Sequence, residues 1–144
     1  MRILVVIFIA TFFVSCHQTD LRLSIRNNSN KSIAFRVGKL NELTGNDVRH
    51  NNAFLNIRAA ENERYIVYTY WENRFSNDSV IYVVALPNPN SKMSKYCCIP
   101  EYDSLKRTGD YFYRKYSLDE LVEKKWLVSF PDDGFKQGDS LLTN

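Results

Sequence analysis

Paired carboxylates are the first candidates for chemistry in this sequence, because Glu101 and Asp103 stand on either side of Tyr102. Two carboxyl groups at a suitable separation can hydrolyse a glycosidic bond, one as the acid and the other as the base or nucleophile. Acids at this spacing are also common in loops, where water simply solvates them, and we favour that interpretation. Catalysis on a glycan or peptide therefore stays an alternative hypothesis, and the sequence predicts no catalytic residue.

Thiol and metal chemistry has still less support. The only histidines are His17, near the N-terminus, and His50, in a polar stretch, so the spacing of a zinc site is missing. Cys97 and Cys98 are adjacent, and neighbouring Cα atoms about 3.8 Å apart strain a disulfide. The two thiols are a redox-sensitive pair, an intermolecular bridge or, as we favour, small side chains of which at least one is buried. We predict no metal and no cofactor.

Aromatic side chains offer a different activity, because the chain has nine tyrosines and two tryptophans. An exposed tyrosine or tryptophan ring stacks on sugars or anchors a protein partner. In residues 65–71 and 111–116 the rings fall on both faces of an expected strand. At least one face then presents rings to a ligand, unless both faces are buried. The predicted binding aromatics are Tyr68, Tyr70, Tyr111 and Tyr113.

The first sixteen residues predict export from the cytoplasm. Arg2 precedes an apolar run of 12 residues, Ile3 to Val14. That run is shorter than the roughly 20 residues of a membrane-spanning helix, but it is typical of a secretory signal. It ends in Ser15 and Cys16, which resembles the lipobox of bacterial lipoproteins, whose cysteine is acylated and becomes the first residue. An ordinary signal peptide with an incidental cysteine is the alternative. We predict a lipoprotein signal peptide over residues 1–15 and lipidation of Cys16.

The charge balance gives no indication of nucleic acid. The formal net charge is +3, and cleavage before Cys16 would also remove Arg2. Nucleic-acid-binding domains carry a stronger, clustered basic surface. The predicted partners are the membrane, through the N-terminal lipid, and an envelope protein or glycan.

Strands dominate the elements that must position these residues. Alternating apolar residues in 21–26 and 33–37 flank a turn cluster at Asn27 to Lys31, which predicts a β-hairpin over residues 21–38. The run Ser79 to Leu86 is apolar on both faces, as expected of a central strand covered on both sides. Further strands are predicted at 54–57, as a weak edge strand, and at 65–71, 111–116 and 126–130.

One short helix is predicted at Ser117 to Lys125. Ser117 can cap its free N–H groups, Glu120 stands three residues later to complete a capping box, and Tyr116 and Leu121 can form a hydrophobic staple. Because so short a helix is unstable alone, it must pack on a sheet. Ser117, Glu120, Leu121 and Trp126 are therefore predicted structural residues.

These elements predict one mainly β domain over residues 21–131, preceded by a lipidated tether at 16–20 and followed by a flexible tail at 132–144. The expected architecture is a small antiparallel β-sandwich of about six or seven strands with one short C-terminal helix. An α+β layered sheet with a helix on one face is the alternative. The predicted core comprises Leu23, Ile25, Ile33, Phe35, Val67, Ile81, Val83, Leu121, Trp126, Val128 and Phe130.

The C-terminal block resembles small lipoproteins of unassigned activity that are abundant in Bacteroides-type bacteria (Bacteroidota). Their chains end in a basic-tyrosine strand, a short helix with an acidic pair, then tryptophan and a strand closed by proline. The corresponding residues here are 114–116, 117–121, Trp126 and 130–131, and the turn at 27–31 also fits. The resemblance implies lipid anchoring and a β-rich fold, and it supplies no catalytic residue.

The same resemblance suggests a location and a modification. Surface-exported lipoproteins of these bacteria usually carry several acids after the cysteine, and here Asp20 stands alone, which predicts an outer-membrane anchor facing the periplasm. These bacteria also glycosylate Asp-Ser-aliphatic tripeptides. Three such tripeptides occur, centred on Ser79, Ser104 and Ser140, and the latter two lie in predicted loops. Ser104 and Ser140 are therefore the candidate O-glycosylation sites.

The sequence as a whole favours a non-catalytic envelope lipoprotein, a binding or accessory module. One alternative is a hydrolase acting on envelope glycan or peptide. Another is a purely structural outer-membrane lipoprotein.

Overall fold

The computed structural model describes residues 19–44, 53–75, 80–87, 95–100, 102–139 and 142. The predictions for the signal peptide and for several candidate residues lie outside this part of the chain. Those residues are Cys16, His17, His50, Ser79, Glu101 and Ser140.

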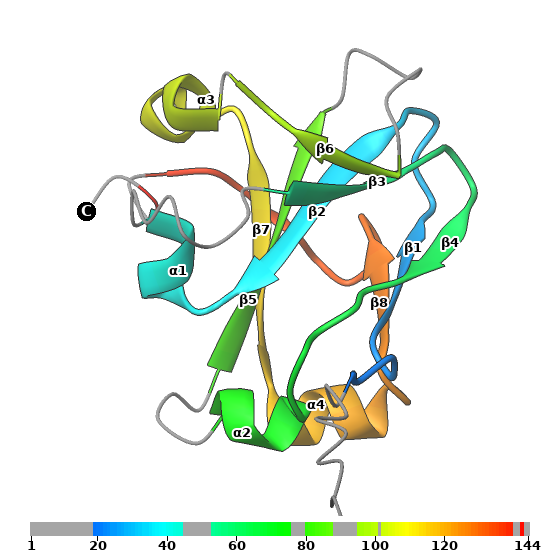
Figure 1. Ribbon diagram of the computed structural model, residues 1–144. Coiled ribbons are helices and arrows are strands. Elements are labelled where there is room, and N and C mark those ends of the chain that lie inside the picture. The colour runs from blue at the N-terminus through cyan, green and yellow to red at the C-terminus, as the bar shows by residue number, and fades with distance from the viewer. Residues whose placement is uncertain are drawn as a thin grey trace, which may run out of the picture.

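Two sheets form the body of the molecule (Figure 1). The larger sheet has the strand order β6-β3-β2-β5-β7-β9, and the smaller has the order β4-β1-β8. The larger sheet comprises β2 (Ile33–Gly38), β3 (Ala53–Ile57), β5 (Val80–Pro87), β6 (Tyr96–Cys98), β7 (Phe112–Ser117) and β9 (Lys136–Gln137). The smaller comprises β1 (Ser24–Asn27), β4 (Asn62–Arg64) and β8 (Leu127–Phe130). The mainly β fold is thus as predicted.

The central position of β5 follows from its sequence. This strand pairs antiparallel with β2 on one side and with β7 on the other. Residues 83–86 are all buried, as are all six residues of β2. Strands covered on both faces lose the alternation of apolar and polar residues, which explains the continuous apolar run that predicted this strand.

The main core lies between the two sheets. It unites apolar residues of β1 and β8 with those of β2, β3 and β5. Ten of the eleven predicted core residues belong to this cluster, and Trp126 packs against it while half-buried. Period-two alternation therefore identified the inner face of the sandwich.

A second core covers the opposite face of the larger sheet. Helices α1 (Leu40–Thr44) and α3 (Tyr102–Thr108) bring Leu43 and Tyr102 onto Phe54 and Val84 of the sheet. The Tyr102 hydroxyl donates to the Leu43 carbonyl, 3.0 Å away, and burial raises the pKa of Tyr102 to about 12. The molecule therefore has three layers, and this helical layer corresponds to the α+β alternative.

Two further helices, α2 (Trp71–Phe75) and α4 (Leu118–Glu123), lie at one end of the sandwich (Figure 1). Ser117 caps α4 as predicted, because its hydroxyl accepts a hydrogen bond from the Glu120 amide. The Glu120 carboxylate was expected to complete a capping box, and the partner that the structure gives it is Arg114. Leu121 and Tyr116 are fully buried. The described part of the chain thus holds four short helices where the sequence predicted one.

The predicted hairpin over residues 21–38 is wrong, because β1 and β2 belong to different sheets. The chain crosses between the sheets at Asn27, whose buried amide group donates to the carbonyls of Lys31, Ile57 and Arg58 at 2.7, 3.0 and 3.1 Å. The Asn27 carbonyl oxygen accepts from Ser29. The asparagine cluster makes a turn as expected, and the turn joins two layers.

The strand predicted at residues 65–71 is also wrong. After β4 only Val67 forms a bridge, with Asp20, and α2 begins at Trp71. The β-branched and aromatic residues of this segment are alternately buried and exposed as they cross the end of the sandwich. The sequence therefore has the two-residue period of a strand, although no neighbouring strand pairs with it continuously. The run at 54–57 is an interior strand, β3, and the edge is β6.

The predicted tail and tether are packed parts of the domain where the structure describes them. Asp20 is buried, so the domain begins before residue 21. At the other end, β9 adds to the larger sheet, Phe135 packs on the main core and Leu142 is buried in the second. The polar composition of 132–144 misled the prediction, since its few apolar residues carry the contacts.

Candidate functional site

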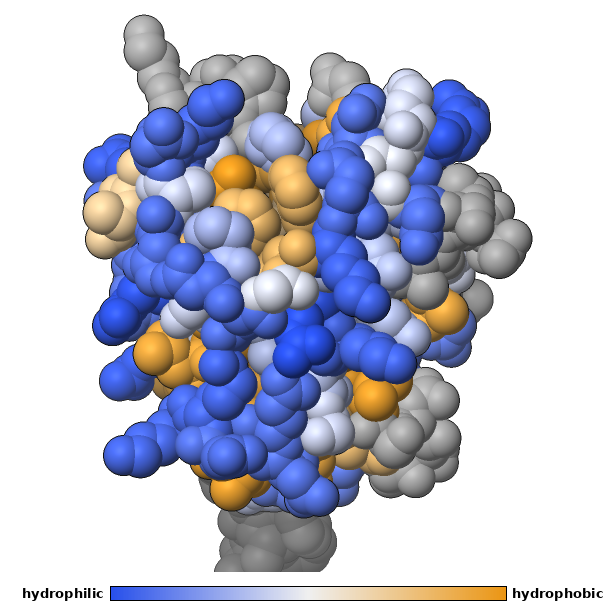
Figure 2. Space-filling model, turned by 180° about the vertical axis from the view of Figure 1, so that it is seen from behind, coloured by the Kyte–Doolittle hydropathy of each residue, from blue (hydrophilic) through white to orange (hydrophobic). Residues whose placement is uncertain are grey.

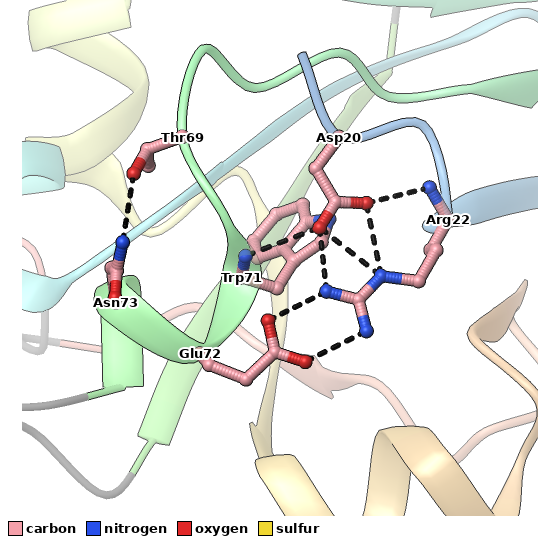
Figure 3. A network of polar contacts seen from close by, with 6 residues as sticks. All are labelled: Asp20, Arg22, Thr69, Trp71, Glu72 and Asn73. Atoms are coloured by element: carbon pink, nitrogen blue, oxygen red, sulfur yellow. Dashed lines mark hydrogen bonds and ion pairs between the residues drawn. The ribbon is translucent and has the colours of Figure 1, made fainter. Parts of the chain in front are cut away.

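An ion-pair network beside the first described residues links two segments that are about 50 residues apart in the sequence (Figure 3). Arg22, just before β1, reaches Asp20 with Nη2 at 2.6 Å from Oδ2. The same guanidinium forms a two-pronged pair with Glu72 of α2, at 2.7 and 2.6 Å. Asp20 also accepts from the Trp71 amide at 3.2 Å. The network fixes the start of the domain to α2.

Electrostatics keep all three groups charged. The hydrogen bond to Glu72, followed by that to Asp20, raises the pKa of Arg22. Hydrogen bonding to Arg22 lowers the pKa of Asp20 and also that of Glu72, which is solvent-exposed. Asp20 is the buried member and its charge is paired, as burial of a carboxylate requires. An arginine held between two carboxylates is a fixed positioning group, and it is not poised for proton transfer.

The network continues into an aromatic stack. The Arg22 guanidinium lies over the Trp126 ring, 4.4 Å from its centroid, and the Trp126 ring lies 6.1 Å from that of Trp71. Trp126 follows α4 in a turn where both it and Lys125 have a positive φ. The sequence placed Trp126 at the start of a strand in the core, whereas the structure places it at the edge of the core beneath a cation.

A surface groove of about 790 Å³ lies on this network. Its walls combine the charged side chains of this network with one further arginine and one aromatic ring. The lining residues are Thr19, Asp20, Leu21, Arg22, Ser24, Arg64, Tyr70 and Glu72. The groove therefore offers a ring, a guanidinium and a carboxylate to a ligand, and it lies where the chain from Cys16 enters the domain.

Most of the exposed apolar side chains of the described residues gather beside this groove. Tyr68 is 77% exposed, Tyr70 48%, Leu21 41% and Ile66 38%. Ile66 lies opposite Leu21, because backbone hydrogen bonds join Asp20 to Val67 and Leu23 to Tyr65 on either side of them. We call the surface formed by Leu21, Arg22, Arg64, Ile66, Tyr68 and Tyr70 the N-terminal face.

Elsewhere the apolar surface is divided. Viewed from behind, hydrophilic residues cover most of the molecule, and the main apolar area, in the upper centre of Figure 2, has polar borders. Among the described residues, the other large apolar side chains exposed to solvent are Tyr96 on β6 and Val122 on α4.

The four predicted binding tyrosines separate into three environments. Tyr68 and Tyr70 are exposed, as their role requires. Tyr111 is fully buried, and its hydroxyl donates to the Asp139 carbonyl at 2.8 Å, so the prediction of a binding role for Tyr111 is wrong. It packs in the second core, which the sequence reasoning missed. Tyr113 is half-buried, and its hydroxyl donates to Asp139 at 3.3 Å.

Tyr113 also lines a small hollow of about 170 Å³ on the larger sheet. Strand register sets Tyr113 opposite Lys136 and Tyr82 opposite Lys115, so lysines and rings alternate across three strands. This hollow is a fifth of the volume of the groove at the N-terminal face and shares none of its residues.

The structure describes one of the three residues considered for catalysis. Asp103 is exposed on α3 and pairs with Lys106 at 2.7 Å. The groups that would accompany it, Glu101 and His50, lie outside the described residues. In that part of the chain no three His, Cys, Asp or Glu side chains are grouped to hold a metal ion.

Two other predicted positions are placed by the structure. Ser104 was expected in a loop and instead lies in the first turn of α3, where it is exposed. Cys98 is a free, exposed cysteine on the edge strand β6, where it pairs with Ala53 of β3.

Sequence reasoning missed Asp20, Arg22 and Glu72 as a unit. The only local signal was the outward position of Arg22 in an alternating stretch. Their association depends on a contact across 50 residues, between Arg22 and Glu72, and no local pattern records such a contact.

Comparison with protein-family models, curated proteins and solved structures finds no match to this chain. Among the residues that the structure describes, no helix has the length and apolar character needed to span a membrane.

Proposed function

We propose that this chain is a lipid-anchored protein of the bacterial envelope that acts by contact, as a non-catalytic binding or accessory module. The sequence supports the anchor through the apolar run ending in Ser15 and Cys16. The observation that carries the contact role is the N-terminal face, where exposed Tyr68 and Tyr70 adjoin an open groove lined with charged groups. An outer-membrane position facing the periplasm, with an envelope protein or glycan as partner, completes the proposal.

The anchor is tested by metabolic labelling with an alkyne fatty acid. The wild-type chain should incorporate the label, and Cys16→Ala should not. Equal labelling of both proteins would remove the lipid anchor from the proposal.

The contact role is tested by pull-down from crosslinked envelopes, in parallel with a hydrolase screen on peptidoglycan and glycan substrates. Tyr68→Ala and Tyr70→Ala should weaken capture, by up to about 2 kcal/mol for a central anchor. Tyr96→Ala is the matched control, because Tyr96 is an exposed ring on a different element. Combined replacement of His50, Glu101 and Asp103 by alanine should leave capture intact. Turnover that disappears in the triple variant, with capture unchanged in the tyrosine variants, would favour the hydrolase.

A further inference from the structure

The distance between the anchor and the folded domain is short. Among the residues that the structure describes, Asp20 is the first that the fold holds by such contacts, through its backbone pairing with Val67 and its ion pair with Arg22. Four residue steps separate it from Cys16, and an extended chain spans at most about 3.5 Å for each step. If Cys16 carries lipid, Asp20 therefore lies within about 14 Å of the membrane surface.

The residues nearest to Asp20 have the character of a membrane interface. Leu21 follows it directly, Ile66 lies opposite Leu21, and Tyr68 follows the residue that pairs with Asp20. Tyrosine rings are enriched at the level of lipid head groups, because they present an apolar body and a polar hydroxyl. Four of the six exposed large apolar side chains in the described structure thus surround the entry point of the tether.

The charge of this surface suits an anionic membrane. Asp20, Arg22 and Glu72 together carry one negative charge, which is offset by Arg64, a groove residue with no ion pair to another described residue. Arg26 is exposed on the same side of β1, because it lies two residues beyond Ser24, which pairs with Arg64. Attraction between an arginine and anionic head groups acts over a Debye length of about 8 Å at physiological ionic strength. The short tether keeps the arginines close enough to the membrane to come within that distance.

We propose that the partner of the N-terminal face is the anionic phospholipid surface of the membrane that holds the anchor, with Leu21, Ile66, Tyr68 and Tyr70 in the head-group region and Arg64 on lipid phosphates. This inference rests on the proposed lipid anchor and specifies what its binding surface contacts. The groove then receives lipid head groups, and β6, at the opposite end of the molecule from α2 and α4 in Figure 1, faces away from the bilayer.

The test uses the full-length lipidated chain in vesicles of phosphatidylethanolamine and phosphatidylglycerol that contain a photoactivatable phospholipid. Mass spectrometry locates the crosslinks. We expect them on residues 19–24 and 64–70, and not on the strand that carries Tyr96. The double variant Ile66→Ser with Tyr68→Ser should lose most of the crosslinking, and Tyr96→Ser should retain it. All three positions are solvent-exposed, and urea melts of each variant confirm an intact fold.

The electrostatic component is measured with Arg64→Gln. Its crosslinking should fall roughly five-fold on vesicles with phosphatidylglycerol, the value for one cation near an anionic surface, and should be unchanged on phosphatidylcholine alone. An equal fall on both kinds of vesicle would contradict a role on anionic lipid.

The outcomes separate this inference from the proposed function. A chain that carries lipid on Cys16 but shows uniform crosslinks, or full crosslinking in the double variant, overturns the docked orientation and leaves the anchor standing. A chain without lipid on Cys16 overturns both. Loss of an envelope protein or glycan from the tyrosine variants, with lipid crosslinks unchanged, assigns the face to that macromolecule and overturns this inference.

Discussion

At the scale of single residues, buried polar side chains hold segments that are far apart in the sequence. Asp133 illustrates this, because one of its carboxylate oxygens accepts from the Tyr116 hydroxyl at 2.8 Å and the Ser129 amide at 2.9 Å, while the other accepts from Lys124 Nζ at 2.7 Å. Burial alone would raise the pKa of the Asp133 carboxyl, but the three donors together lower it below its ordinary value of 3.8. The same burial raises the pKa of Tyr116.

This arrangement predicts an acid-sensitive contribution to stability. A carboxyl whose folded-state pKa is lowered stabilises the fold above its ordinary pKa, and the contribution is lost as the pH falls through the lowered value. Asp133→Asn should therefore cost about 1.5–3 kcal/mol at neutral pH, and the cost should shrink as the pH falls below the ordinary value of 3.8. Urea melts across this range compare the two proteins. Parallel stability curves at every pH would contradict the assignment.

Asn27 is the second such residue, at the crossing between the sheets. Its side-chain NH2 group donates to three backbone carbonyls, and its side-chain oxygen accepts from the Ser29 amide. Asn27→Ala leaves buried carbonyls without a donor, so unfolding free energy should fall by about 1–3 kcal/mol. Asn28→Ala is the control, because Asn28 is exposed and its change should stay within about 0.5 kcal/mol. Urea melts of both variants that agree with the wild type would show that Asn27 is dispensable.

At the scale of elements, the end of α4 shows why a short helix can be stable here. The amide of Trp126 donates to the Leu121 carbonyl and the amide of Lys125 to the Val122 carbonyl, the two hydrogen bonds of a Schellman motif. Trp126 and Leu121 are both packed at the main core, which supplies the apolar contact of that motif. Lys125 stands at the left-handed position that glycine usually occupies, with φ of 53°.

Replacement of this lysine should therefore stabilise the domain. Left-handed backbone costs a non-glycine residue about 1–2 kcal/mol, and glycine recovers it at an entropic cost of about 0.5–1 kcal/mol. Lys125→Gly should raise the unfolding free energy by about 0.5–1 kcal/mol, measured by thermal or urea melts.

Gly134→Ala is the converse test. Gly134 has φ of +77°, and an added Cβ would meet no atom within 4 Å, so only backbone strain opposes the change. We expect a loss of about 1 kcal/mol. Unchanged stability in both variants would show that neither turn is constrained.

Local sequence patterns predicted the elements whose formation depends on interactions between residues close in the sequence. Alternation found the inner residues of β1, β2 and β8, and the cap at Ser117 found α4. The pairing of β1 with β4 and β8 depends on partners about 40 and 100 residues away, so a turn of asparagines was read as a hairpin. For the candidate site, the sequence named Tyr68 and Tyr70 among four candidate binding rings, with burial of both strand faces as the alternative, and it did not predict the Asp20–Arg22–Glu72 network.

At the scale of the whole molecule, the C-terminal segment closes the fold. Phe135 lies 5.0 Å from Phe130, centroid to centroid, β9 extends the larger sheet, and Leu142 completes the second core. These contacts reach both cores, so residues beyond Pro131 belong to the cooperative unit.

A chain ending at Pro131 should therefore be strongly destabilised. It loses Asp133, the burial of Leu142, worth roughly 1.5–3 kcal/mol, and the partial burial of Phe135, worth less. The expected loss of about 4–6 kcal/mol approaches the whole stability of a small domain. Urea melts and hydrogen exchange would measure it. A truncated chain with the midpoint of the full-length protein would restore the earlier expectation of a dispensable tail.

The parallel pairing of β1 with β8 sets the order in which the chain can assemble. Ser24 pairs with Leu127 and Asn27 with Phe130, so β1, whose other partner β4 follows about 40 residues later, finds its parallel partner only after about a hundred further residues have been synthesised. Closing so long a loop slows folding. The smaller sheet therefore stays incomplete until β8 appears, whereas the β2–β5 ladder of the larger sheet needs no part of β8. Pulse-labelled hydrogen exchange during refolding should find the amides of β1 protected together with those of β8, and later than those of the β2–β5 ladder.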